Sequence, residues 1–282
     1  MRFAIIAERR YLGQRMPAAL LPAILNAGHS ADIICSDDQL WDFPSHLPSF
    51  DAYDGVIARD RSLLGLFLLA WAERSGVPVV NPRAAIEGVR NKAEMAATLA
   101  ADGIAMPPTI VCRRVDQLEQ LPDAFFPLVL KPNIGDNGNG IQIVTAQNVS
   151  GVQLRHGSLI LAQKFVPNDG FDLKLYVAGE SVWAVRKPNL WCSSGGSVPS
   201  PIRLNEQMRA LALRCGKALG LEVYGVDALP DPGGLQVLEV NEFPNFSGVA
   251  EAPEAVANVL IARAGQHQRC AVSTGESRVG GP

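Results

Sequence analysis

The sequence predicts an α/β protein in which a mostly parallel N-terminal sheet is followed by hairpin-rich α+β lobes. Two observations carry this prediction. Short apolar strands alternate with helices over residues 1–90, which is typical of a parallel sheet covered by its own crossover helices. From Asn91 onward, strands are instead joined by glycine-rich loops and tight turns, which favour antiparallel pairing.

In the N-terminal part, the helix expected over Pro17–Ala27 ends at Gly28, a residue suited to a helix C-terminus. The apolar run Leu63–Ala72 reaches only about half of the 20 residues that a membrane-spanning helix needs. We therefore interpret it as a buried helix or a subunit interface, which leaves room for a homodimer or a homotetramer. Strands are expected at Phe3–Ala7, at Ala31–Cys35, within YDGVIARD, and at Val77–Asn81.

In the second part, a helix beginning at Asn91 stops at Gly103, and a second, amphipathic helix is expected over Asn205–Gly220. After Ala264 the chain is polar and aperiodic, and we expect a disordered tail over residues 266–282. Extended segments are expected at PPTIVC, at FFPLVLKP, at GSLILAQKFV, in a hairpin about Gly179 and Glu180, and in a hairpin that turns at DPGG.

The composition excludes several classes of protein. The chain has 282 residues, 48% of them apolar and 19% charged, which is enough for a substantial core. With a net charge of −3, the chain lacks the basic surface that is typical of nucleic-acid-binding proteins. The N-terminal apolar run is too short for a signal peptide, and no segment is long enough to cross a membrane. Five scattered cysteines without metal-ligand spacing indicate a reducing, cytoplasmic setting.

Polar residues interrupt the apolar strand LQVLEVNEF. Glu239 and Asn241 are two residues apart, so they point to the same face of the strand. The hairpin that turns at DPGG brings Asp227 of the preceding strand near both of them. Two carboxylates and an amide form a set of oxygen ligands that suits Mg²⁺. The alternative interpretation is a hydrogen-bonded polar rim of the sheet.

The glycine-rich segment GDNGNG follows a strand that ends in Lys131. It is neither a Walker A motif nor a Rossmann loop, because it joins two strands. Gly135, Gly138 and Gly140 would let backbone N–H groups bend over phosphates, and Lys131 could reach a phosphate as a point charge. An ordinary hairpin loop is the alternative.

Several motifs in order resemble the ATP-grasp superfamily. They are NK, VLKP with its glycine loop, LAQKFV, DLKLYVAGE, GVD and LEVNEFP. The segments DGVIARDRS and GVPVVNPRAAIEGVRNK are similar to the region before the ATP-grasp lobes in ribosomal-protein glutamate ligases (RimK-like) and lysine-biosynthesis ligases. The resemblance implies an ATP-grasp fold with a Rossmann-like N-terminal domain over 1–90, a lid lobe over 91–165 and a magnesium-binding lobe over 166–265.

The resemblance implies a role for each matching residue. The nucleotide would be held by ATP-phosphate lysines, by the glycine loop, by a hinge that reads adenine through its backbone, and by an aspartate near the ribose or the substrate entrance. Mg²⁺ or Mn²⁺ would be held by Asp227, Glu239 and Asn241, and the γ-phosphate or acyl phosphate by Lys174 with Arg186 or Lys187. The nucleotide set is Lys92, Lys131, Gly135, Gly138, Gly140, Gln163, Lys164, Phe165, Val166 and Asp172.

Two departures from the family pattern bear on the reaction. The second hinge position, usually a glutamate, is Lys164 here, and a lysine cannot accept the adenine amino proton. The loop KPNLWCSSGGSVPS has the glycines of the glutamate-ligase substrate loop but lacks its arginine. The segments LAQKFV to RKPNL, and NEFPNFSGV, are also similar to inositol-polyphosphate kinases of the same superfamily.

The resemblance implies a carboxylate–amine ligase that uses ATP and acts through an acyl phosphate on small-molecule carboxylate and amine substrates. The alternatives are a small-molecule kinase that phosphorylates a hydroxyl group, and an ATP-binding protein without chemistry. The second substrate is expected at Arg59 and at the loop that contains Trp191, Ser193 and Ser194. Arg59 ends a strand of the parallel sheet, where ligands gather, although a surface salt bridge with Asp60 or Asp54 would also explain it.

Overall fold

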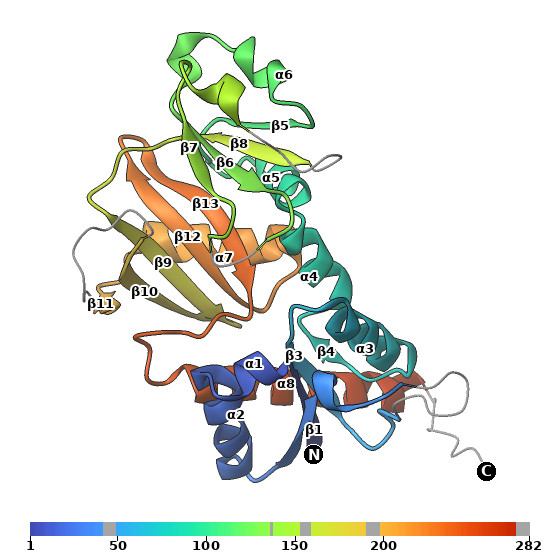
Figure 1. Cartoon of the computed structure of the whole chain (residues 1–282). Helices are drawn as coiled ribbons and strands as arrows, with labels where there is room; N and C mark the ends of the chain where they lie inside the picture. Colours follow the sequence, from blue (N-terminus) through green and yellow to red (C-terminus); the bar gives the residue numbers. More distant parts are fainter. Residues whose placement is uncertain (42–48, 136–137, 153–158, 190–197, 275–282) are drawn as a thin grey trace.

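The computed structural model describes residues 1–41, 49–135, 138–152, 159–189 and 198–274. Three sheets follow one another along the molecule, with the N-terminal sheet at one end, a five-stranded sheet in the middle and a four-stranded lid sheet at the other end (Figure 1). The predicted α/β fold, with a parallel N-terminal sheet and antiparallel sheets after it, is confirmed.

The N-terminal sheet has the strand order β2-β1-β3-β4, and all pairs are parallel. Helices cover both of its faces, so β1 is buried on both sides: Phe3 and Ile5 face one core, while Ala4 and Ile6 face the other. Its strands are β1 (Arg2–Ala7), β2 (Ser30–Cys35), β3 (Gly55–Arg59) and β4 (Val79–Val80), and its helices are α1 (Arg9–Leu12), α2 (Arg15–Asn26) and α3 (Leu63–Arg74), with a 3₁₀ turn at Ser36–Asp38.

Helix α3 contains the apolar run of the sequence. It buries Leu66, Leu68, Leu69 and Ala72 against the N-terminal sheet, which confirms the buried-helix interpretation. Among the described residues, no helix is both long and apolar enough to span a bilayer. Two further helices, α4 (Arg83–Arg90) and α5 (Lys92–Ala101), lead from this sheet to the lid (Figure 1).

The lid sheet is antiparallel, with the order β5-β8-β6-β7. Its small core contains Leu118, Leu128, Leu130, Val149 and Ile160. The elements are β5 (Thr109–Cys112), β6 (Leu128–Pro132), β7 (Gln142–Val144), β8 (Ile160–Lys164), the short helix α6 (Asp116–Glu119) and 3₁₀ turns at Asp123–Phe125 and Val149–Gly151.

The middle sheet is antiparallel, with the order β11-β10-β9-β12-β13. One face packs on helix α7 (Glu206–Leu219), where Leu175 and Val177 meet Leu211 and Cys215. The opposite face is turned toward the lid. The strands are β9 (Phe171–Ala178), β10 (Ser181–Pro188), β11 (Ser200–Ile202), β12 (Val223–Asp231) and β13 (Gly234–Glu242).

The C-terminal segment corrects the sequence prediction. A long helix, α8 (Ala252–Thr274), continues ten residues past Ala264, where the polar tail was expected to begin, so residues 266–274 are helical. The helix packs beside α2 and under β1, with Val256 and Leu260 in the same core as Phe3 and Ile5 (Figure 1). The rest of the predicted tail, 275–282, lies outside the described residues.

Contacts between the N-terminal part and the middle sheet fix their relative positions. Buried Asn81 donates from Nδ2 to the carbonyl of Val223 at 2.6 Å and accepts from the N–H groups of Glu222 and Val223 at 2.8 and 2.9 Å. Arg15 donates to the carbonyls of Phe246, Val249 and Ala250. The Asn81 bonds hold the start of β12 against the N-terminal part, and the Arg15 bonds hold the segment after β13 there.

Candidate active site

A cavity of about 590 Å³ lies where the lid sheet, the middle sheet and the edge of the N-terminal part meet. Its walls carry most of the polar residues that the sequence singles out. The lid contributes the strand ends and the glycine loop, the middle sheet contributes β9, β10, β12 and β13, and the N-terminal part contributes the end of β3. The sequence therefore converges on one place in three dimensions.

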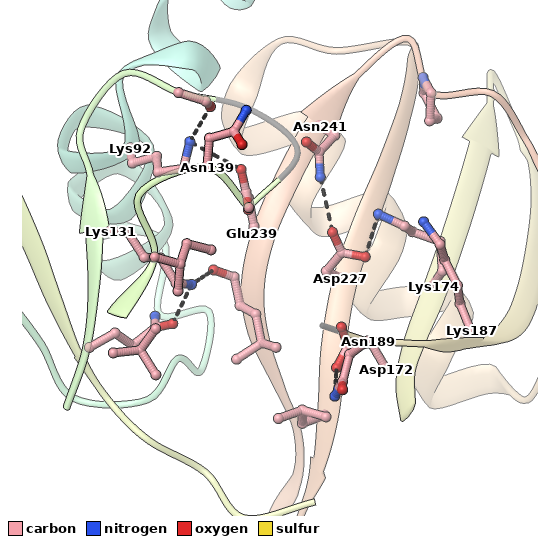
Figure 2. A pocket seen from close by; sticks show the side chains of 18 of the residues that line it. Lys92, Lys131, Asn139, Asp172, Lys174, Lys187, Asn189, Asp227, Glu239 and Asn241 are labelled. Atoms are coloured by element: carbon pink, nitrogen blue, oxygen red, sulfur yellow. Dashed lines mark hydrogen bonds and ion pairs between the residues drawn. The ribbon is translucent and has the colours of Figure 1, made fainter. Parts of the chain in front are cut away.

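The predicted oxygen cluster is assembled in this cavity (Figure 2). In the β12–β13 register, Asp227 lies opposite Glu239, and Gly225 lies opposite Asn241. The Asn241 amide Nδ2 donates to Asp227 Oδ2 at 3.0 Å, so the amide and this carboxylate are in contact. The side chains of Asp227 and Glu239 are 19% and 25% exposed, so both can reach a ligand.

This donor set fits a hard cation. The described residues hold no group of three or more His, Cys, Asp or Glu side chains that could bind a metal by themselves. Two carboxylates and one amide oxygen are instead what Mg²⁺ uses when phosphate oxygens and water complete its shell. The residues that would hold the ion are Asp227, Glu239 and Asn241.

Each carboxylate of the cluster is paired with a lysine (Figure 2). Lys174 of β9 forms an ion pair with Asp227, and Lys92 of α5 lies 3.3 Å from Glu239. Both lysine side chains are less than 10% exposed. Burial acts to lower the pKa of Lys174, but Asp227, with smaller contributions from Tyr176 and Glu239, outweighs it and the pKa is raised. Lys174 therefore stays protonated beside the carboxylate.

Lys131 is buried at the end of β6 and has no carboxylate partner at bonding distance among the described residues. Its Nζ donates to Gln163 Oε1 at 2.8 Å and to the carbonyl of Leu238 at 3.4 Å. Burial lowers its pKa, because the charged form is poorly solvated there. A phosphate would supply the counter-charge that this ammonium group lacks.

The glycine loop closes one end of the cavity. Gly135, Gly138 and Asn139 line it, whereas Gly140 does not. Gly140 has φ +76°, and a Cβ there would approach Pro132 Cγ to 2.9 Å, so only glycine fits. Lys92 Nζ donates to the carbonyl of Gly135 at 2.9 Å, which ties the start of α5 to the loop.

The expected hinge borders the cavity with Gln163, Lys164, Phe165 and Val166. Gln163 is buried and connects Lys131 to Thr109, to which it donates from Nε2 at 3.1 Å. The ammonium group of Lys164 donates to the carbonyls of Ala124 and Phe126 at 2.5 and 2.7 Å. Lys164 therefore connects the hinge to the 3₁₀ turn at Asp123–Phe125 and the residue after it.

Strands β9 and β10 bring Asp172, Lys174 and Lys187 to one face, because Lys187 lies opposite Asp172 in the register. Asn189 donates to Asp172 at 3.0 Å, and burial raises the pKa of Asp172. Arg186 is different. It lies opposite Leu173, stacks on Phe171 and pairs with Asp169 at 2.6 Å, and it is not among the described residues that line the cavity.

Arg59, at the end of β3, lines the cavity from the N-terminal part. It donates from one Nη to the carbonyl of Phe243 at 2.6 Å, and its guanidinium lies 4.5 Å from the centre of the Tyr11 ring. The proposed salt bridges with Asp54 or Asp60 are not formed. Trp191, Ser193 and Ser194, the other residues expected at the second substrate, lie outside the described residues.

Sequence analysis missed several polar residues that line the cavity, Arg61 and Asn189 among them. Asn139 lies within the glycine loop, and Asn245 and Ser247 lie just after β13. Glu242 also lines the cavity and is buried against Arg90, at 2.8 Å. Strand alternation assigns Glu242 to the other face from Glu239 and Asn241, yet Glu242 is the last residue of β13 and still borders the cavity.

Comparison with known proteins gives a consistent result. Residues 89–263 match the family of RimK-like ATP-grasp domains. A protein of Shewanella loihica named "Probable alpha-L-glutamate ligase" is 30% identical over 279 residues, which cover 89% of this chain and 91% of that protein. The "Tetrahydromethanopterin:alpha-L-glutamate ligase" of Methanococcus maripaludis is 30% identical over 200 residues, covering 66% and 68% of the two chains.

Solved structures share the fold. The RimK domain protein ATP-grasp of Sphaerobacter thermophilus superimposes with a TM-score of 0.75 at 21% identity, covering 93% of this chain and all of that one. The ATP-grasp ligase PsnB, solved with a minimal precursor, Mg and ADP, gives a TM-score of 0.69 at 16% identity, with 93% and 98% covered. D-cycloserine synthetase DcsG gives 0.69 at 20%, with 94% and 100% covered.

The first prediction concerns the metal. Asp227→Asn or Glu239→Gln removes a charge that would hold Mg²⁺ against phosphate, so Mg²⁺-dependent turnover of ATP should fall by at least about 100-fold, since changes one shell further out already cost 10–100-fold. Turnover is measured at saturating Mg²⁺. Glu254→Gln, which removes the same charge at an exposed position of α8, serves as the control. Wild-type turnover in either site variant would contradict the metal assignment.

The second prediction concerns Lys131. Lys131→Ala should weaken ATP binding by roughly 10- to 100-fold, because a charge-assisted contact contributes roughly 1.5–3 kcal/mol. Binding is measured by calorimetry with a non-hydrolysable ATP analogue. Lys217→Ala, on the exposed face of α7 and away from the cavity, should bind normally. If the two variants bind alike, Lys131 serves only the packing of the lid.

Proposed function

The chain belongs to the RimK-like ATP-grasp family and is an ATP-dependent carboxylate–amine ligase. From this premise we propose that it joins the amino group of L-glutamate to a carboxylate of a second small molecule. The relatives named as glutamate ligases support L-glutamate as one substrate. The cavity supports the reaction, because it combines an oxygen cluster for a metal with several lysines for phosphates.

The proposal rests on two ion pairs in the cavity, Lys174 with Asp227 and Lys92 with Glu239. The first pair joins the neighbouring strands β9 and β12, and the second joins α5 to β13. When the nucleotide enters, the lysines turn to its phosphate oxygens and the carboxylates are released to hold Mg²⁺. Mg²⁺ supplies charge neutralisation and orientation of the γ-phosphate. The exchange leaves none of these four charges without a partner, and an unpaired charge would be costly in a cavity of low exposure.

The nucleotide lies between the lid and the middle sheet. The hinge residues Gln163 to Val166 hold adenine through their backbone, and Asp172 faces the ribose. Lys92 and Lys131, with the backbone of Gly135 and Gly138, hold the phosphates. The lid contacts in the ligand-free chain support this arrangement, because Lys131 is already directed into the cavity by Gln163.

The reaction has two steps. A carboxylate oxygen of the first substrate attacks the γ-phosphorus, the bond to the bridging oxygen breaks, and ADP leaves with that electron pair. The deprotonated amine then attacks the acyl carbon, and inorganic phosphate leaves. Lys174 and Lys187 stabilise negative charge on the transferred phosphoryl group, and closure of the lid keeps water from the acyl phosphate.

Arg186 has no direct role in this proposal, because its side chain is on the other face of β10. The kinase alternative, transfer to a hydroxyl, would use the same nucleotide site and give no free phosphate. The relatives from Shewanella loihica and Methanococcus maripaludis carry ligase names, which favours the ligase reaction over the kinase reaction.

The third prediction tests the reaction itself. With ATP, Mg²⁺, a panel of carboxylic acids and hydroxylamine in place of the amine, the wild-type protein should release one phosphate per ADP and form a hydroxamate, because hydroxylamine traps an acyl phosphate. Asp227→Asn should form neither product. A phosphorylated product without free phosphate would replace the ligase proposal with the kinase alternative.

The fourth prediction concerns Arg59, whose planar guanidinium suits a bidentate carboxylate contact. Arg59→Ala should raise the KM for the amino-acid substrate by roughly tenfold or more and leave the KM for ATP nearly unchanged. Arg15→Ala is the matched control, because Arg15 binds carbonyls of the same loop but does not line the cavity. Equal effects of both substitutions on the amino-acid KM would make Arg59 a structural residue.

A further inference from the structure

The end of the cavity formed by β3 and the loop after β13 has features that the nucleotide and metal do not use. The loop, residues 243–248, contributes Pro244, Asn245 and Ser247 to the cavity wall. Arg59 and Arg61 of the N-terminal part line the same space. Polar side chains of two different parts of the chain therefore converge there.

The loop is held in an uncommon conformation. Phe243 and Phe246 both have positive φ, +37° and +50°, which non-glycine residues rarely adopt. Both rings are buried, and the carbonyls of the same residues accept hydrogen bonds from Arg59 and Arg15. Backbone conformations of this kind persist where the surroundings enforce them, and they concentrate at ligand sites. Asn245, between the two phenylalanines, is thus fixed at the cavity.

The amide of Asn245 is only half used. Its Nδ2 donates to Gln14 Oε1 at 2.7 Å, whereas its Oδ1 is buried and has no hydrogen-bond partner among the described residues. The same Gln14 oxygen accepts from Arg59 at 3.4 Å. Arg59 Nε is likewise buried without such a partner. Buried polar atoms are normally hydrogen-bonded, so an acceptor and a donor without partners on two side chains that share the Gln14 oxygen favour a polar ligand here.

The charge balance at this end is positive. Arg59, Arg61 and Arg90 stand against one cavity carboxylate, Glu242, which lies 2.8 Å from Arg90 and 4.0 Å from Arg61. Asp60 is a second carboxylate, which is buried and, among the described residues, bonded only to the neutral Ser36 and Ser62, so the three arginines still outnumber the two carboxylates. Glu242 is therefore already engaged, and the excess positive charge favours an incoming carboxylate.

A neutral oxygen is well suited to hold a reacting amine. An ammonium group donates to an amide oxygen, but an amide does not hold its proton as a carboxylate would, because a negative partner raises the pKa of an ammonium group. The amine must lose that proton before it can attack. A buried amide acceptor can thus orient the nitrogen without suppressing its reactivity.

We infer that this end of the cavity holds the amine-bearing substrate as an α-amino acid, with its α-carboxylate at Arg59 and its amino group at Asn245 Oδ1. The inference rests on the proposed function for the reaction itself. Asn245 is the new element: it would determine that an amino acid, rather than a simple carboxylate, occupies this end.

The test compares Asn245→Ala and Asn245→Asp with the wild-type chain, with L-glutamate as the amine and ATP at saturation. Asn245→Ala should raise the KM for L-glutamate by about tenfold, with the KM for ATP unchanged. Asn245→Asp keeps the size and the acceptor. It should move the ascending limb of the kcat–pH profile with L-glutamate to higher pH, because the new carboxylate raises the pKa of the bound ammonium group, which must lose its proton before it attacks. A merely structural residue would not shift that limb.

Binding of glutarate, which lacks the amino group, adds an independent readout. The wild-type chain should bind L-glutamate more tightly than glutarate, and Asn245→Ala should lose most of this preference. Asn26→Ala, exposed at the end of α2, should retain it. Thermal melting confirms that the variants fold, and Asn245→Asp carries the test if the alanine variant does not.

Two results would overturn the inference. One is an unchanged glutamate KM and pH profile in both Asn245 variants, and the other is a rise only in the KM of the carboxylate co-substrate. Hydroxamate formation with hydroxylamine separates this failure from that of the proposed function, because it requires ATP and the carboxylate but not the amino-acid site. Variants that still form hydroxamate while their glutamate kinetics match wild type refute the assignment of this end alone.

Discussion

The structure depends on one constraint: cations and carboxylates buried in the same cavity must neutralise one another. Lys174 with Asp227 and Lys92 with Glu239 satisfy it in the ligand-free chain, and each lysine is less than 10% exposed. Removing one partner would leave a buried charge uncompensated, which is far more costly than losing a surface pair. Loss of one of these four charges is therefore costly, and each group needs a new partner when a metal and phosphates enter.

The fold supplies these groups from separate elements, and this explains the three-sheet arrangement. Lys92 begins α5, Glu239 lies on β13, and Lys174 and Asp227 are cross-strand partners on β9 and β12. The β12–β13 pairing has a bulge next to Asp227: Asp227 pairs with Glu239 and Ala228 with Val237, so Leu238 has no partner in β12. The carbonyl of Leu238 contacts Lys131 at 3.4 Å. The metal cluster and the lid lysine are thus linked through the backbone irregularity of one hairpin.

Much of this arrangement follows from local sequence rules. Strand alternation put Glu239 and Asn241 on one face, the DPGG turn brought Asp227 beside them, and apolar periodicity located most strands and helices. The choice between Arg186 and Lys187 stayed open at that stage, because neighbours in a strand face opposite sides and only the register with β9 shows that Lys187 lines the cavity. The helix over 266–274 was missed because its polar sequence has no periodicity, and it continues a helix whose earlier turns are packed on β1. Asn245 gave no signal, since its position depends on φ values that tertiary contacts impose.

The positive end of the cavity also accounts for a departure in the sequence. The segment KPNLWCSSGGSVPS resembles the substrate loop of glutamate ligases but has no arginine, so a carboxylate-bearing substrate needs its cation from elsewhere. Arg59 and Arg61 line the cavity from the N-terminal part, and Arg59 is held there by the Phe243 carbonyl and the Tyr11 ring. Burial lowers the pKa of Arg59, yet an arginine remains protonated at neutral pH because its ordinary pKa is so high. A lysine in the same buried position would lose its charge more readily. An arginine at position 59 can therefore keep a permanent positive charge at the carboxylate site that we propose there.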